Sequence, residues 1–139
     1  MTMVDIAANK ALARSYFTML EADDAAGALA LLSDDALWTV PGESELAGTM
    51  TKADVLAMFE GGLPFAAPLA FVIHDMIAEG DRVVVRVEGR APLKDGRDYH
   101  NFYVFIFTIA AGRIMSVIEH TDTLYSFRAL IEPQQPGGG

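Results

Sequence analysis

The stretch "VVVRVEGR", Val83 to Arg90, decides which fold the chain can adopt. Its β-branched residues alternate with charged ones, and this period of two is typical of a β-strand. Successive side chains of a strand point to opposite faces, so one face carries only valines, namely Val83, Val85 and Val87. Arg86 and Glu88 lie on the other face. That face is either solvated or the wall of an internal cavity, and the two interpretations lead to different functions.

More strand patterns accompany this stretch in the C-terminal half of the chain. They predict strands at about residues 69–78, 82–90, 98–109 and 113–123. The breaks between them, "EGD", "PLKDG" and "AAGR", have the composition of turns. The second half of the chain is therefore expected to form a meander of strands.

The N-terminal half has helical spacing instead. An amphipathic helix is predicted over residues 4–21, a second short helix in "AAGALALL" after Asp23 or Asp24, and a third in "ADVLAMFE", opened by the capping sequence "TKAD". Helices followed by strands predict an α+β fold. We expect one domain over residues 1–131 and a disordered tail over 132–139.

Composition excludes several classes of function. A formal net charge of −9 repels phosphate backbones, so no nucleic-acid partner is expected. The chain has no cysteine, and its three histidines lack metal-ligand spacing, so we expect neither a metal nor a cofactor. No apolar run reaches the roughly 18 residues of a membrane span, and the N-terminus lacks a signal-peptide pattern. We therefore expect no membrane contact and a cytoplasmic location.

The segment "FYVFIFTIAA", residues 102–111, is apolar on both faces of its strand. A sheet with one solvated face should alternate, so this strand is expected to be covered on both sides. The helices can cover one face only. We expect a second copy of the chain to cover the other, convex face in a two-fold homodimer. The alternative is that the C-terminal segment folds back over that face.

The order of "SDDALWTVPG", the strand pair "DG…Y…F.F…GRI" and the closing "IEHTD" resembles the SnoaL-like members of the nuclear-transport-factor-two superfamily. The resemblance covers roughly residues 5–127. The superfamily also contains polyketide cyclases, steroid isomerases and limonene-epoxide hydrolases. The resemblance implies a curved antiparallel sheet wrapped around helices, which forms a cone with an apolar pocket. Because this fold hosts many chemistries and some non-enzymes, function depends on the residues at the site.

The steroid-isomerase pattern is only partly present. The resemblance places Tyr16 at the tyrosine of the oxyanion hole, but the base and acid positions fall on Val40 and Val104. Valine cannot move a proton, so that mechanism is not available. Tyr16 is therefore interpreted as a core or pocket tyrosine.

The epoxide-hydrolase pattern fits better. Those relatives carry an arginine and an acid two residues later on one strand, and a second acid at the end of the last strand. The matching positions here are Arg86, Glu88 and Asp122, with glutamate in place of the family's aspartate. The two residues that hold the attacking water align with Trp38 and Val40 and do not match. Polyketide-cyclase relatives also place an acid–base aspartate in the last strand, again at Asp122.

These matches give a catalytic hypothesis. Arg86 between Glu88 and Asp122 would neutralise one acid, and the two acids would share a proton. Glu119 is expected to point to the dimer side and to take no part. The expected pocket residues are Tyr16, Trp38, Val40, Phe59, His100, Val104, Ile118 and His120.

Two plainer interpretations stay open. Arg86 and Glu88 could form an ion pair on a solvated strand. Asp122 could cap a helix in "TDTLYSF".

The sequence thus predicts a cofactor-independent enzyme that moves protons on a small apolar molecule, polycyclic or isoprenoid, in the manner of a SnoaL-like cyclase or isomerase. One alternative is an epoxide hydrolase of the limonene-epoxide hydrolase type. Another is a non-catalytic small-molecule-binding or dimerisation module.

Overall fold

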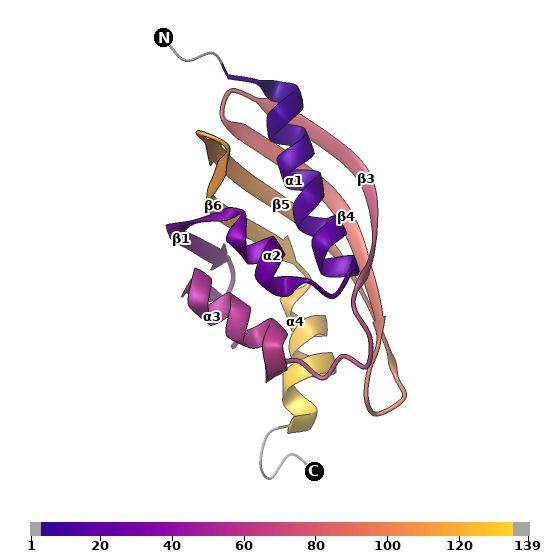
Figure 1. Cartoon of the computed structure of the whole chain (residues 1–139). Helices are drawn as coiled ribbons and strands as arrows, with labels where there is room; N and C mark the ends of the chain where they lie inside the picture. Colours follow the sequence, from indigo (N-terminus) through magenta and orange to yellow (C-terminus); the bar gives the residue numbers. More distant parts are fainter. Residues whose placement is uncertain (1–3, 135–139) are drawn as a thin grey trace.

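The computed structural model describes residues 4–134 and combines helices with one curved, unclosed sheet (Figure 1). The predicted α+β class is confirmed. The α-helices are α1 (Ile6–Glu21), α2 (Ala25–Ala30), α3 (Lys52–Ala57) and α4 (Thr123–Ser126). The strands are β1 (Leu32–Val40), β2 (Gly48–Thr51), β3 (Ala70–Glu79), β4 (Arg82–Pro92), β5 (Asp98–Ala110) and β6 (Arg113–Thr121). Short π-helical segments extend α3 and α4 over Met58–Gly62 and Phe127–Ile131.

The six strands form one sheet in the order β2-β1-β6-β5-β4-β3. All neighbours are antiparallel except β1 and β6, which run parallel. Strands β3 to β6 form the meander that the turn signals predict. The pairing of the last strand with the first brings residues from both ends of the chain side by side, and this is where the site forms.

Aspartate and threonine caps start the helices where the sequence indicates. Asp24 accepts a hydrogen bond from the backbone N–H of Gly27 at the start of α2. Thr51 and Asp54 form the predicted capping box of α3, each side chain accepting from the other residue's backbone N–H. Such caps satisfy amide groups that have no partner within the helix.

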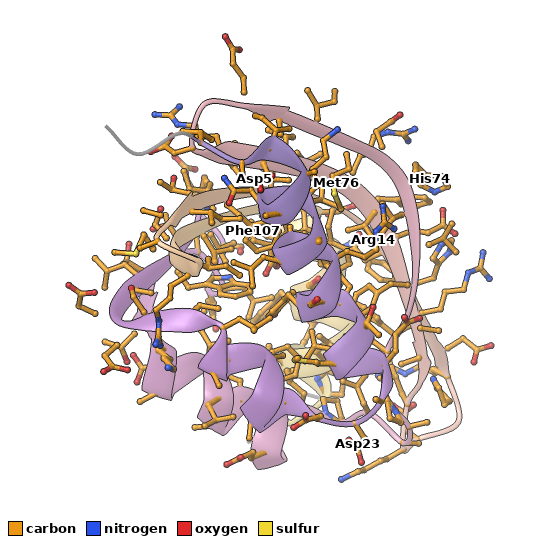
Figure 2. The ribbon with its side chains drawn as sticks, turned by 45° about the horizontal axis from the view of Figure 1, so that its top comes forward. Asp5, Arg14, Asp23, His74, Met76 and Phe107 are labelled. Carbon is orange, nitrogen blue, oxygen red and sulfur yellow. The ribbon has the colours of Figure 1, made fainter. Side chains whose placement is uncertain are left out.

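One face of the sheet, which we call the inner face, packs against the helices. In Figure 1, α1 lies over β3 and β4, and α3 lies next to β1, which it contacts. Phe105 and Phe107 of β5 stack on this face with ring centroids 5.7 Å apart, and both contact Tyr16 and Phe17 of α1. Figure 2 shows Phe107 in the interior beside α1.

The opposite or outer face carries the charged residues of β4. Val83, Val85 and Val87 are buried toward the helices, whereas Arg82, Arg86 and Arg90 are exposed on the outer face. His74 of β3 also lies on this side, away from the helices (Figure 2). The charged side of "VVVRVEGR" was expected to be the wall of a cavity, and this expectation is wrong, because that side is solvated and the valines pack inward.

The C-terminal segment does not fold back over the outer face. Its side chains Tyr125, Ala129 and Leu130 pack instead with Tyr99, on the inner side of β5. In the single chain, no described segment covers the outer face.

One strand and two boundaries differ from the sequence-based prediction. Strand β2 was not predicted, because its four residues carry no clear period. The last strand ends at Thr121, since Asp122 caps α4 by accepting from the backbone N–H of Tyr125. Glu132–Gln134 form a 3-10 turn where a disordered tail is expected, and 135–139 lie outside the described residues. None of the helices within residues 4–134 is long and apolar enough to cross a membrane.

Candidate functional site

The inner face of the sheet and the helices enclose a hollow, which we call the inner pocket. The space open to the centres of water-sized molecules is about 110 Å³. A single water needs roughly 10–15 Å³ by this measure, so the pocket can hold a small organic molecule. Its walls are mostly apolar and include Leu20, Val40, Met50, Val55, Phe59, Phe65, Phe71 and Phe105. The polar lining comes from Tyr16, Trp38, Tyr99, Tyr103, Glu119, Thr121, Thr123 and Ser126.

Strand register directs Glu119 into this pocket. Glu119 lies directly opposite Phe105 in the antiparallel pair of β5 and β6. Residues opposite each other share a face of the sheet, and Phe105 is buried on the inner face. The indole Nε1 of Trp38, on the neighbouring strand β1, donates a hydrogen bond of 3.1 Å to Glu119 Oε1.

Burial changes the acidity of Glu119. Glu119 is partly buried and lines the apolar pocket, and loss of hydration raises the pKa of its carboxyl group from the ordinary 4.5 to about 7, against the opposing effect of the Trp38 hydrogen bond. Among the described residues, Trp38 is its one hydrogen-bonding partner. A carboxyl with this pKa can both accept and donate a proton near neutral pH.

Two tyrosines share the pocket with Glu119. The pKa values of Tyr16 and Tyr103 are raised well above the usual value of 10, mainly by burial and to a smaller extent by neighbouring groups. Both therefore stay protonated at neutral pH and can act as hydrogen-bond donors. The Tyr16 ring lies 5.7 Å from the Trp38 ring, so it also supports the indole that holds Glu119.

A second polar cluster lies where β5 meets α4. The hydroxyl of Tyr99 contacts the hydroxyl of Tyr103 and lies 2.9 Å from Ser126 Oγ. Asn101 Nδ2 donates to Ser126 Oγ at 2.8 Å and to the backbone carbonyl of Asp122 at 3.1 Å. Tyr99, Asn101 and Ser126 are all buried, so this network is shielded from solvent.

Four of the expected pocket residues line the inner pocket: Tyr16, Trp38, Val40 and Phe59. The other four do not. His100 and Val104 of β5, and Ile118 and His120 of β6, occupy the alternate positions of their strands and lie on the outer face.

The expected placement of Arg86 and Glu88 in the pocket is wrong. The Nε of Arg86 donates at 2.6 Å to Asp75 Oδ2, and both side chains are more than half exposed. Glu88 lies between two histidines, with His74 Nε2 at 2.9 Å and His100 Nε2 at 3.4 Å. The hydrogen bond from His74 lowers the pKa of Glu88, and the nearby imidazole of His100 has a smaller effect in the same direction. Both residues point outward because the all-valine face of β4 is the one that packs against the helices.

Asp122 does not lie in the inner pocket either. Its side chain caps α4, and its backbone carbonyl accepts from Asn101. Together with Arg86, Val104 and His120 it borders a shallow hollow on the outer face. Arg86, Val104, His120 and Asp122 are therefore brought together as predicted, but they lie on the opposite side of the sheet from the apolar pocket.

Glu119 is the residue that the sequence analysis missed. The error came from assigning the charged side of "VVVRVEGR" to the cavity, which reverses both faces of every paired strand. The available signal was the uninterrupted set of valines at Val83, Val85 and Val87. Had that face been placed inward, Phe105 and then Glu119 would have followed by register.

A model of the SnoaL-like domain matches residues 13–117, most of the chain. The protein belongs to the SnoaL-like domain family. This family is part of the nuclear-transport-factor-two superfamily, which includes cyclases and isomerases. None of the curated proteins is significantly similar to the chain in sequence.

Solved structures similar to this SnoaL-like protein share its fold. An NTF2-like protein of unknown function from Burkholderia pseudomallei is 23% identical, with 89% of this chain and 98% of that chain covered and a TM-score of 0.74. AclR from Streptomyces galilaeus, a suggested hydroxylase, is 19% identical, with 90% and 96% covered and a TM-score of 0.76. A suggested ketosteroid isomerase from Kribbella flavida is 22% identical, with 86% and 82% covered and a TM-score of 0.67. At these identities the likeness shows the fold alone.

No group of three or more histidine, aspartate or glutamate side chains within residues 4–134 is arranged to hold a metal ion.

The raised pKa of Glu119 predicts a pH-dependent stability difference between the wild type and Glu119→Gln. Folded Glu119 keeps its proton up to about pH 7, whereas the unfolded residue loses it near 4.5. The free energy of unfolding of the wild type should therefore fall, relative to the variant, as the pH rises between these values. The change should be about 3 kcal/mol.

Urea unfolding of both proteins at a series of pH values measures this difference. Glutamine keeps an oxygen that can accept from the Trp38 N–H, but it does not titrate. The other titrating residues are the same in both proteins, so their pH effects cancel in the difference between the two free energies of unfolding. A stability difference that does not vary between pH 4.5 and 7 would contradict the assignment.

Proposed function

We propose that the protein is a cofactor-independent enzyme that moves a proton on a small apolar molecule bound in the inner pocket, with Glu119 as the acid–base group. The observation that carries this proposal is a carboxyl group whose pKa is about 7, facing an apolar hollow. General acid–base catalysis works best when the pKa of the catalytic group lies near the working pH.

The pocket suits an apolar ligand because apolar side chains make up most of its wall. Exclusion of water by such a ligand would strengthen every hydrogen bond and charge interaction in the pocket. Perturbed acidity in an apolar cavity is a recurrent sign of a catalytic site.

The proposed reaction neither consumes nor releases a proton overall. The Glu119 carboxylate accepts a proton from an acidic C–H of the ligand, and the electron pair of the broken bond stays on the ligand. The protonated carboxyl then returns the proton to another atom of the same molecule, which regenerates the carboxylate. The result is an isomerisation, or a cyclisation when the carbanion attacks within the molecule.

Similar proteins support the reaction class. One solved structure with this fold carries the suggested activity of a ketosteroid isomerase, and the superfamily includes cyclases. Epoxide hydrolysis is not favoured, because Arg86, Glu88 and Asp122 lie outside the inner pocket.

We also propose that the outer face of the sheet pairs with a second copy of the chain. Apolar side chains are exposed there on two strands, with Val72 and Ile77 on β3 and Phe102 on β5 each more than half exposed. Stable burial of such a face would reduce the apolar surface in contact with water.

Charge on the outer face supports a second copy as the occupant. The whole chain has a formal net charge of −9, so two copies repel each other over most of their surface. On the outer face, Arg82, Arg86 and Arg90 offset most of the charge of Asp75, Glu79, Glu88 and Asp98, so this face is closer to neutral than the chain as a whole. A two-fold axis through this face would therefore bring together the surfaces with the least mutual repulsion.

The catalytic proposal predicts that Glu119→Gln loses proton transfer. Cyclic ketones dissolved in D₂O should exchange their acidic C–H for deuterium faster with the wild type than without protein. The variant should be slower by about a hundredfold or more, because amides are not effective bases at neutral pH. Nuclear magnetic resonance of the ketone measures the exchange.

The matched control is Glu88→Gln, which changes the same residue type on the outer face and should keep the wild-type rate. Equal exchange by wild type and Glu119→Gln would remove Glu119 from the mechanism. Binding of ketones without exchange by any protein would favour the non-catalytic binding module.

The pairing proposal predicts that the wild type sediments with twice the mass of one chain, and that Phe102→Glu sediments with the mass of one chain. Pairing of the outer faces would bury the new carboxylate in the interface, which is costly for an unpaired charge. Leu124→Glu alters an equally exposed apolar residue away from the sheet and should leave the mass unchanged. A wild type that sediments as a single chain would rule the pairing out.

A further inference from the structure

Asn101 fixes the direction of hydrogen bonding at one end of the second polar cluster of the pocket. Asn101 Oδ1 accepts from the backbone N–H of Phe102 at 2.8 Å, and Asn101 Nδ2 faces the carbonyl of Asp122 at 3.1 Å. A backbone N–H can only donate and a carbonyl can only accept. The amide can therefore adopt one orientation only, and its NH₂ group must donate to Ser126 Oγ.

Counting hydrogens shows that the cluster has one to spare. The hydroxyls of Ser126, Tyr99 and Tyr103 carry three hydrogens, but they are joined by only two hydroxyl-to-hydroxyl contacts. One hydroxyl hydrogen therefore has no acceptor among the described residues of the cluster. A buried donor without an acceptor costs roughly 1–3 kcal/mol, so this hydrogen should lie where another molecule can accept it.

Tyr103 is where that hydrogen is best placed. All three residues line the pocket, but Ser126 and Tyr99 are almost fully buried, whereas Tyr103 is only partly buried. Asn101 also donates weakly toward the Tyr99 hydroxyl at 3.4 Å, so donors approach the network from its buried end. With the spare hydrogen on Tyr103, donation would run from Asn101 to Ser126, from Ser126 to Tyr99, and from Tyr99 to Tyr103, which both hydroxyl contacts allow because either oxygen of each can be the donor.

We propose that Tyr103 donates this last hydrogen to an acceptor oxygen of the bound molecule, so that the ligand is an apolar compound with a carbonyl or similar oxygen. Tyr99, Ser126 and Asn101 are positioning residues that orient Tyr103 and strengthen its donation, since hydrogen bonds in a chain polarise one another. This inference rests on the proposed function, because it requires that the inner pocket takes a small apolar molecule.

The position of Tyr103 relative to Glu119 fits such a ligand. Tyr103 lies opposite Thr121 on the adjacent strand, and Thr121 is two residues from Glu119 on the same face. The two groups are therefore diagonal neighbours on the pocket wall. One molecule can present an oxygen to Tyr103 and, a few atoms away, the C–H that Glu119 deprotonates. Donation to that oxygen would stabilise the negative charge left on the ligand.

Asp122 ties this network to the C-terminal helix. Its side chain caps α4, and its backbone carbonyl accepts from both Asn101 and the N–H of Ser126. The start of α4 is thus held against β5, which keeps Ser126 within reach of Tyr99.

A matched pair of probes tests the inference: acetophenone, and α-methylstyrene, in which a C=CH₂ group replaces the carbonyl. Tyr103→Phe should weaken acetophenone binding about tenfold, as expected for loss of one buried hydrogen bond. It should leave α-methylstyrene binding within about twofold, because the phenylalanine ring keeps the shape of the wall. Titrations followed by nuclear magnetic resonance give both dissociation constants.

The carbonyl stretch of bound acetophenone provides a readout that a change of shape alone would not move. It should shift to lower frequency in the wild type and in Glu119→Gln, and return to its value in an apolar solvent in Tyr103→Phe. Ser126→Ala, which shortens the chain of donors, should give an intermediate shift. Tyr16→Phe separates the two pocket tyrosines and should remove less of the shift than Tyr103→Phe.

The outcomes separate the two proposals. If both probes bind but Tyr103→Phe affects them equally, or leaves the carbonyl stretch unchanged, the inference is wrong and the proposed pocket stands. Loss of the shift in Tyr16→Phe with its retention in Tyr103→Phe would also overturn the inference. If neither probe binds the wild type, the proposed function fails and the inference fails with it.

Discussion

The hydrogen bond from the Trp38 indole to Glu119 fixes a carboxyl group inside an apolar hollow, and the chemistry open to this protein follows from that pair. It depends on the parallel pairing of β1 with β6, which brings residues 81 positions apart in sequence onto neighbouring strands. An isolated carboxylate in such surroundings would be costly, and the raised pKa is how the structure meets that cost. At neutral pH the buried carboxyl of Glu119 lowers the stability of the folded protein, but it provides a group that can accept and donate protons.

The remaining polar groups of the pocket complement Glu119. The carboxyl faces the hollow from β6, while the hydroxyl network built on Tyr99, Asn101 and Ser126 ends at Tyr103 on β5. Between them the wall is apolar, so a ligand would be oriented by few polar contacts. The outer face has a different character, with exposed ion pairs such as Arg86 with Asp75.

Local patterns predicted the elements well, and the choice of face was what failed. The strand meander, the Asp24 cap and the capping box at Thr51 are set by neighbouring residues, so they can be recognised in the sequence. Which face of a strand packs inward depends on the partner strands. "FYVFIFTIAA" is apolar on both faces, so alternation could not decide there. The resemblance to epoxide hydrolases then favoured Arg86 and Glu88, and the single Trp38 contact that marks Glu119 is not visible without the fold.

The acidity of Glu119 itself tests the account most directly. Glutamate labelled with ¹³C at the side-chain carboxyl gives one resonance per residue, and Glu119→Gln identifies the one that belongs to this group. A titration of that resonance should show a midpoint at a pH of about 7. A midpoint near the ordinary glutamate value of 4.5 would mean that the carboxyl is hydrated, and would contradict a buried acid–base group in the inner pocket.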